Sequence, residues 1–229
     1  MANFGNLTQK YDKFVIFDTE TTGLNFARDE IIEFSAVVLE VQNGEAVVTQ
    51  EYDNLVTLSP GNTVPAMITQ LTGITNQDIQ ERGIPKDRLC RDIAQMFQGN
   101  PLLLAYNAHF DLSFLFYLLL RNGDVSILKG KDKLDLLTVY KDRRPYPHKL
   151  LNAIESYGLS GKVVNSHRAI DDVLATAAVM EAMIEEKDDL SHYVNLFGYN
   201  PKYGIDGKPI GSVTYKPQAF QNSIPLYQK

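Results

Sequence analysis

The chain has 229 residues, 44% of them apolar, and a formal net charge of −6. This length and apolar content allow a sizeable buried core and exclude wholesale disorder. The acidic balance argues against a protein that coats nucleic acid through non-specific contacts, because such proteins usually have a basic surface. It does not argue against a metal-dependent enzyme, because bound divalent ions change the local field.

Cysteine and apolar patterning point to a cytoplasmic protein. Cys90 is the only cysteine, which excludes an intramolecular disulfide and a cysteine-rich zinc site and fits a reducing cytosol. No signal peptide is visible at the N-terminus. No run of about 18 apolar residues occurs, so no membrane-spanning segment is expected.

Three strands are predicted at the start of the chain. Phe14 to Phe17 are four consecutive apolar residues, which predict a buried strand over residues 13–20. Residues 30–41 and 45–58 are rich in Val, Ile and Phe, and Asn43-Gly44 between them is a strong hairpin signal. We therefore expect the chain to open with an antiparallel meander.

Helices then alternate with two more strands. A short helix is predicted at 65–72, a short turn capped by residues 75–78, and an amphipathic helix at 85–98. The later predicted elements are strands at 102–106 and 133–135 and helices at 110–121, 136–141, 149–157, 170–185 and 189–197. The pattern predicts an α/β domain over 1–190 with a mixed five-stranded sheet flanked by helices. Residues 191–229 are expected to form an irregular, tyrosine-rich C-terminal tail that packs on the domain or on a partner.

Two carboxylates follow the first predicted strand. Asp18 and Glu20 are two residues apart, so their side chains point to the same face, while Thr19 points to the other. Two close negative charges repel unless a cation lies between them. Oxygen ligands favour a hard ion such as Mg²⁺ or Mn²⁺. Alone, this triplet is equally consistent with a polar strand end.

Further polar residues lie where other strands end or helices begin. Asp111 falls one turn into a predicted helix, and Asp172 falls at the start of another. Either acid alone is most simply explained by the favourable helix dipole. His167 lies in a loop, and Asn107 in a turn. Sites in α/β sheets gather at the carboxyl ends of strands, so these groups are candidates for one site.

Taken together, these residues form three motifs in a fixed order. They are Asp18-x-Glu20-Thr21-Thr22-Gly23, Asn107-Ala108-x-Phe110-Asp111 and His167-x-Ala169-x-x-Asp172. This set resembles the DEDDh 3′–5′ exonucleases, the family that includes the proofreading (epsilon) subunit of bacterial DNA polymerase III. The segment Leu71–Thr75 also resembles that family, and the similarity covers about residues 13–185. Tyr106 stands where many relatives have His.

The resemblance implies a ribonuclease H-like fold and a two-metal-ion hydrolase. Asp18, Glu20, Asp111 and Asp172 would hold two divalent cations, Mg²⁺ or Mn²⁺, and His167 would act as general base. The enzyme would release nucleoside 5′-monophosphates from the 3′ end of DNA in proofreading or repair. Further residues would bind or support the terminal nucleotide: Thr21, Thr22, Asn107 and Phe110.

Partners and alternatives follow from the same resemblance. The expected partners are nucleic acid 3′ ends, single-stranded or frayed, and a DNA polymerase or another replication protein, with no membrane. Five cations are candidates for contacts with upstream phosphates: Lys141, Arg143, Arg144, Lys149 and Arg168. An exoribonuclease that trims RNA 3′ ends, or a polymerase-associated binding module, would fit the same motifs.

Overall fold

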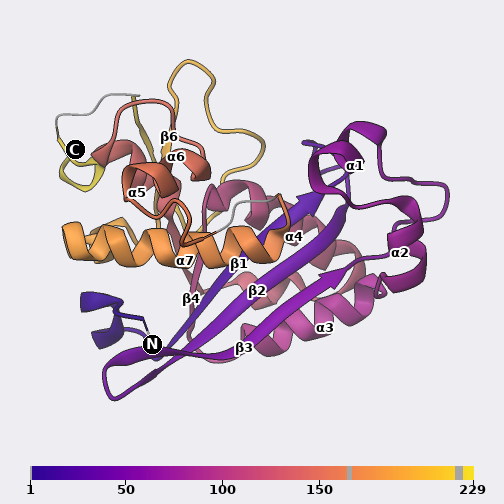
Figure 1. The fold of residues 1–229 in the computed structure, drawn as a ribbon, viewed down its shortest axis with the longest axis horizontal. Coiled ribbons are helices and arrows are strands. Elements are labelled where there is room, and N and C mark those ends of the chain that lie inside the picture. Colours follow the sequence, from indigo (N-terminus) through magenta and orange to yellow (C-terminus); the bar gives the residue numbers. More distant parts are fainter. Residues whose placement is uncertain (1, 164–166, 220–223) are drawn as a thin grey trace.

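A computed structural model describes residues 2–163, 167–219 and 224–229 (Figure 1). In this part of the chain the central sheet has five strands in the order β3-β2-β1-β4-β5. The strands are β1 (Lys13–Thr21), β2 (Ile31–Gln42), β3 (Glu45–Leu55), β4 (Leu102–Ala105) and β5 (Asp132–Asp135). The pairs β1–β2 and β2–β3 are antiparallel, and β4 and β5 run parallel to β1. The predicted mixed five-stranded sheet is confirmed.

Helices cover both faces of this sheet. The α-helices are α1 (Ala66–Thr72), α2 (Asn76–Arg82), α3 (Lys86–Met96), α4 (Ala108–Asn122), α5 (Leu136–Arg143), α6 (Leu150–Ser156) and α7 (Ala169–Glu186). Helix α7 crosses one face, and α3 and α4 lie against the other (Figure 1). No helix among the described residues is both long and apolar enough to cross a membrane.

Side chains of β1 point alternately to the two faces of the sheet, so this strand contributes to a hydrophobic core on each face. Phe14 and Ile16 are fully buried in the core that contains the inner face of α7. Val15 and Phe17 are buried in the core beneath α3 and α4. Because side chains alternate along a strand, the next residues of β1 continue the same two faces.

Local turn signals act as the sequence predicts. Asn43 and Gly44 both have positive φ, 53° and 86°, as a tight hairpin requires. Thr75 and Asp78 form a reciprocal capping box at the start of α2. Strand β3 ends at Leu55, three residues before the predicted end, since the backbone beyond it pairs with residue 84 instead.

The predicted helix over 189–197 is wrong in its second half. A 3₁₀ turn covers Leu190–Tyr193, and strand β6 follows at Leu196–Tyr199. Asn195 separates them with a φ of 57°, and its side chain bonds the backbone N–H of Lys133 and the carboxylate of Asp132. The tail is otherwise irregular, except that β7 (Thr214–Pro217) pairs in parallel with β6 and the short 3₁₀ turn Leu226–Gln228 follows.

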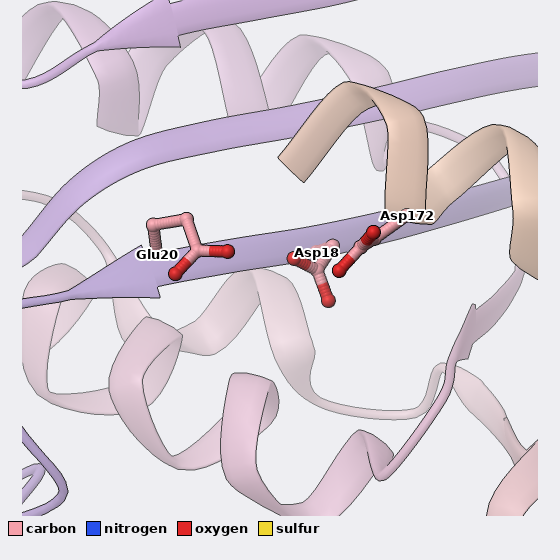
Figure 2. Close-up of side chains that lie close together, drawn as sticks. All are labelled: Asp18, Glu20 and Asp172. Carbon is pink, nitrogen blue, oxygen red and sulfur yellow. The ribbon is translucent and has the colours of Figure 1, made fainter. Parts of the chain in front are cut away.

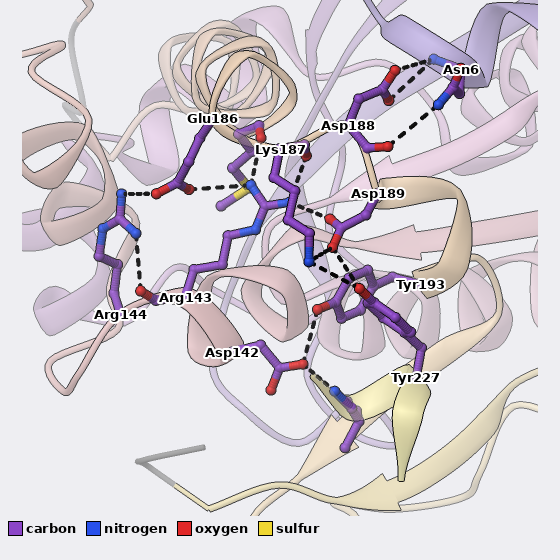
Figure 3. A network of polar contacts seen from close by, with 12 residues as sticks. Asn6, Asp142, Arg143, Arg144, Glu186, Lys187, Asp188, Asp189, Tyr193 and Tyr227 are labelled. Atoms are coloured by element: carbon purple, nitrogen blue, oxygen red, sulfur yellow. Dashed lines mark hydrogen bonds and ion pairs between the residues drawn. The ribbon is translucent and has the colours of Figure 1, made fainter. Parts of the chain in front are cut away.

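Both ends of the chain meet at the C-terminal end of α7 (Figure 3). Asp188 accepts hydrogen bonds from the Asn6 backbone, and Asp189 accepts one from the Tyr227 hydroxyl. Leu226 beside Tyr227 is fully buried. These contacts show that Leu226 and Tyr227 of the tail pack on the domain. The predicted domain boundary at residue 190 stays a prediction.

The same network contains two of the cations predicted to contact phosphates, and that contact stays a prediction. Arg143 pairs with Asp189 and Glu186, and it donates to backbone carbonyls at the end of α7. Arg144 pairs with Glu186 at 2.8 Å. Both guanidinium groups are therefore engaged in holding α7, at the end away from the acidic motifs (Figure 3).

Candidate active site

Strand β1 carries the first two acids past the end of its parallel neighbour. Its pairing with β4 runs from Phe14 to Ile16, so the later residues of β1 have a free side there. Asp18 and Glu20 lie on the face covered by α7 and project toward the start of that helix (Figure 2). Both side chains are partly buried. The predicted common orientation of these two carboxylates is confirmed.

Helix α7 brings a third acid to them. Asp172 lies in its first turn and is buried. Carboxylate oxygens of Asp18, Glu20 and Asp172 all lie within 4.8 Å of one another (Figure 2). Residues separated by some 150 positions thus converge at one end of the sheet, and their spacing is small enough for them to share a cation.

Asp111 reaches the same strand from the opposite side. It is buried in the first turn of α4, and its Oδ1 accepts hydrogen bonds from the Thr19 backbone N–H (3.0 Å) and hydroxyl (2.7 Å). Thr19 faces α4 because it alternates with the two acids of β1. These bonds use the free side of β1 beyond β4, and they fix Asp111 next to Asp18.

The four carboxyl groups repel one another in this buried setting. Burial raises the pKa of Asp18 well above its usual range, and the charges of Asp111, Asp172 and Glu20 raise it further. Burial, with repulsion from Asp172, raises the pKa of Glu20 to about 8. Burial also raises the pKa of Asp111 to about 7, although that group accepts two hydrogen bonds. A divalent cation would relieve this repulsion.

This repulsion predicts a pH dependence of stability without metal. A carboxyl group with a raised pKa binds its proton more tightly in the folded chain than in the unfolded chain. For Glu20, this difference in bound protons extends from pH 4.5, the ordinary pKa, to about pH 8, the pKa in the folded chain. Stability therefore falls as pH rises through this window. In calorimetry with EDTA, we expect the Tm at about pH 8.5 to lie several degrees below that at about pH 5.5, since 1 kcal/mol shifts Tm by roughly 2–4 °C at this chain length.

The Glu20→Gln variant is the control for this prediction. It removes one repelling charge and should make the difference between the two Tm values smaller. Mg²⁺ should raise the wild-type Tm more at the higher pH, where it does not compete with protons. An equal or higher Tm at pH 8.5 in EDTA would contradict the account of the cluster.

His167 precedes Asp172 by five positions in the sequence, but it is not part of the carboxylate cluster of Asp18, Glu20 and Asp172. Its side chain is exposed, and its backbone has a φ of 57°. It immediately precedes Arg168, the residue before α7. The predicted role of His167 as general base stays a prediction.

The predicted substrate contacts lie at the ends of the same elements. The hydroxyl of Thr21 donates to Gly23 O (2.6 Å), and that of Thr22 accepts from the Glu30 backbone N–H (2.9 Å), so both hold the loop after β1. Asn107 is exposed at the turn before α4, with a φ of 71°. Phe110 packs on a neighbouring ring of α4. Their contact with substrate stays a prediction.

Sequence reasoning missed two buried acids that anchor the helices of the site. Asp135 accepts hydrogen bonds from the backbone N–H groups of Asn107 (2.9 Å) and Ala108 (3.1 Å) at the start of α4. Glu33 of β2 is fully buried and pairs with Arg168, while the predicted phosphate contact of Arg168 stays a prediction. An acid inside the apolar run of residues 31–34 was the signal that could have revealed Glu33.

Comparison with known proteins places this geometry in a family. The RNase_T model, described as exonuclease, matches residues 15–180. The PolC-type DNA polymerase III of Caldanaerobacter subterraneus is 32% identical over 179 residues, which cover 78% of this chain and 12% of that protein. The 3′–5′ exonuclease DinG of Bacillus subtilis is 32% identical over 185 residues, covering 79% of this chain and 18% of DinG.

Solved structures agree on the fold. Escherichia coli exonuclease I in complex with a dA16 oligonucleotide has a TM-score of 0.68 at 20% identity, covering 80% of this chain and 42% of that chain. The present chain spans less than a fifth of the length of the two curated relatives. Since the family model covers well over half of the chain, and the three motifs lie within or beside one acidic site as the resemblance implied, the protein belongs to the exonuclease family.

Proposed function

We propose that this protein is a metal-dependent 3′–5′ exonuclease that releases nucleoside 5′-monophosphates from the 3′ end of DNA, in proofreading or repair. The observation that carries the proposal is the convergence of Asp18, Glu20 and Asp172 within 4.8 Å, with Asp111 fixed to the same strand. The relatives with polymerase and 3′–5′ exonuclease names support the substrate class.

The donor set fits hard divalent cations. All four groups are carboxylates, and burial together with neighbouring carboxylates raises the pKa values of Asp18 and Glu20. Oxygen-only donors favour Mg²⁺ or Mn²⁺ over softer metals. Asp18, Glu20, Asp111 and Asp172 would hold two such ions, which supply activation of a water and neutralisation of charge on the phosphodiester oxygens.

The protein's own groups then have distinct tasks. An imidazole nitrogen of His167, the exposed histidine of the third motif, accepts the proton of the attacking water. Thr21 and Thr22 hold the loop next to Glu20 and line the path of the terminal nucleotide. Asn107 and Phe110, at the start of α4, flank the same end of the sheet.

The partners proposed are single-stranded or frayed 3′ ends and a polymerase or another replication protein. A solved structure with a similar fold contains a dA16 oligonucleotide, and curated sequence relatives include PolC-type DNA polymerases III. An exoribonuclease acting on RNA 3′ ends has the same acidic chemistry, and the two substrates differ at the 2′-hydroxyl. The cytoplasmic location stays a prediction.

A cleavage assay tests the proposal. With Mg²⁺ or Mn²⁺, a 5′-labelled DNA oligonucleotide should shorten stepwise from its 3′ end and release 5′-monophosphates, and EDTA should stop the reaction. Circular single-stranded DNA of the same sequence is the control, because it has no 3′ end and should stay intact. Cleavage of the circle would contradict an exonuclease, and faster shortening of matched RNA would assign the exoribonuclease instead.

A further inference from the structure

Glu33 lies on β2, next to the acids of the neighbouring strand β1. It is the register partner of Glu20, so its side chain shares the α7 face of the sheet. The residue is fully buried. An ionised carboxylate in this position is costly unless it is paired and hydrogen-bonded. The groups that bind Glu33 therefore determine its role in the structure.

Glu33 binds the segment that enters α7. The Arg168 guanidinium donates to it through both Nε, at 2.9 and 3.2 Å, and Nη2. The backbone N–H of Ala169, the first residue of α7, donates to its Oε2 at 2.9 Å. The first N–H groups of a helix have no partner within the helix, and Arg168 supplies no side-chain cap here, so Glu33 satisfies one of these groups.

This anchor lies between the two functional residues of the third motif. His167 precedes Arg168 directly, and the Asp172 backbone N–H donates to the Arg168 carbonyl at 3.2 Å, closing the first turn of α7. A rigid ion pair at Arg168 thus fixes the start of the helix on the same sheet face as Glu20. Like charges on Asp18, Glu20 and Asp172 push the helix start away from the strand, and the ion pair opposes that movement.

We propose that Glu33 and Arg168 are positioning residues that set the metal-binding geometry of Asp172 and the orientation of His167. The inference rests on the proposed function. In contrast to a purely structural ion pair, it predicts that the pair controls metal affinity and turnover in the folded protein. Outer groups that orient metal ligands commonly change affinity or activity by about 10- to 100-fold when replaced.

The test compares two isosteric changes at opposite ends of α7. Glu33→Gln weakens the anchor at its start. Asp189→Asn weakens the buried pair with Arg143 at its other end (Figure 3) and is the matched control. Arg168→Lys keeps the charge but loses the planar fork that binds a carboxylate through two N–H groups.

Three measurements separate positioning from structure. They are the Kd for Mn²⁺ by electron paramagnetic resonance, kcat and KM on a DNA oligonucleotide, and amide hydrogen exchange of residues 169–173 without metal. Glu33→Gln should weaken Mn²⁺ binding and lower kcat by about 10- to 100-fold, leave KM unchanged, and speed exchange in the first turn of α7. Asp189→Asn should lower Tm while leaving the Kd and kcat at wild-type values.

The outcomes distinguish this inference from the proposed function. A wild type that neither binds Mn²⁺ nor cleaves DNA overturns both. A wild type that does both, with Glu33→Gln matching it in Kd and exchange, overturns the positioning role alone. Equal losses in Glu33→Gln and Asp189→Asn would also overturn it, because they would reflect general destabilisation. If Glu33→Gln does not fold, Arg168→Lys decides by the same measurements.

Discussion

Replacing Asp18 by Asn should abolish 3′–5′ cleavage and raise the Tm of the metal-free protein. A carboxylate oxygen of Asp18 lies within 4.8 Å of those of Glu20 and Asp172, and four neighbouring acids raise the pKa of Asp18 on top of burial. Metal ions supply several kcal/mol of charge stabilisation in such reactions, so losing a central ligand should lower kcat by at least roughly 10³-fold. The amide removes one charge from a repelling cluster, which accounts for the higher Tm.

The two effects have opposite signs, and this makes the test specific. Rates are measured on a labelled oligonucleotide with saturating Mg²⁺, and Tm is measured by calorimetry in EDTA at about pH 8. Ser35 faces the same side as Asp18 one strand away, and its hydroxyl donates to Asp53. Ser35→Ala is therefore a nearby control that should keep activity. Wild-type cleavage by Asp18→Asn would show that the acids do not hold the catalytic ions.

Replacing His167 by Gln should lower kcat by about 10²–10⁴-fold, the usual contribution of a general base, with Mn²⁺ affinity kept. The imidazole is exposed and lies outside the carboxylate cluster, so its loss removes the proton acceptor without removing a ligand.

His192 provides the control for this variant. It is also exposed, but it stacks on Tyr227 at the far end of α7. His192→Gln should therefore keep the wild-type kcat. If His167→Gln instead loses Mn²⁺ binding in proportion to its rate, His167 is a ligand and the proton acceptor lies elsewhere.

Local sequence patterns predicted most elements of this fold. Alternating and apolar runs marked β1 and β2, and a capping box and Asn43-Gly44 marked where elements begin and turn. These signals depend on neighbours in the chain, so they are visible without the structure. The two errors, at the end of β3 and around Asn195, arose where the backbone bonds residues far along the chain.

The candidate site shows the same contrast between local sequence signals and contacts between distant residues. The spacing of Asp18 and Glu20 on a strand predicted their shared face, and helix starts predicted where Asp111 and Asp172 lie. The sequence could not show that Thr19 holds Asp111, because that bond joins residues 92 positions apart. Nor could it show that Glu33 forms an ion pair with Arg168, which lies 135 positions away. Pairing of charges across the fold is set by tertiary packing rather than by periodicity.

Counting bound Mn²⁺ per chain tests the central claim most directly. Equilibrium dialysis with detection by electron paramagnetic resonance should find two ions per wild-type chain, coupled to each other, as expected for a two-metal site. Asp18→Asn should lose this coupled pair. A wild type that binds no Mn²⁺, or an Asp18→Asn variant that binds it as the wild type does, would contradict the assignment of these carboxylates as a metal centre.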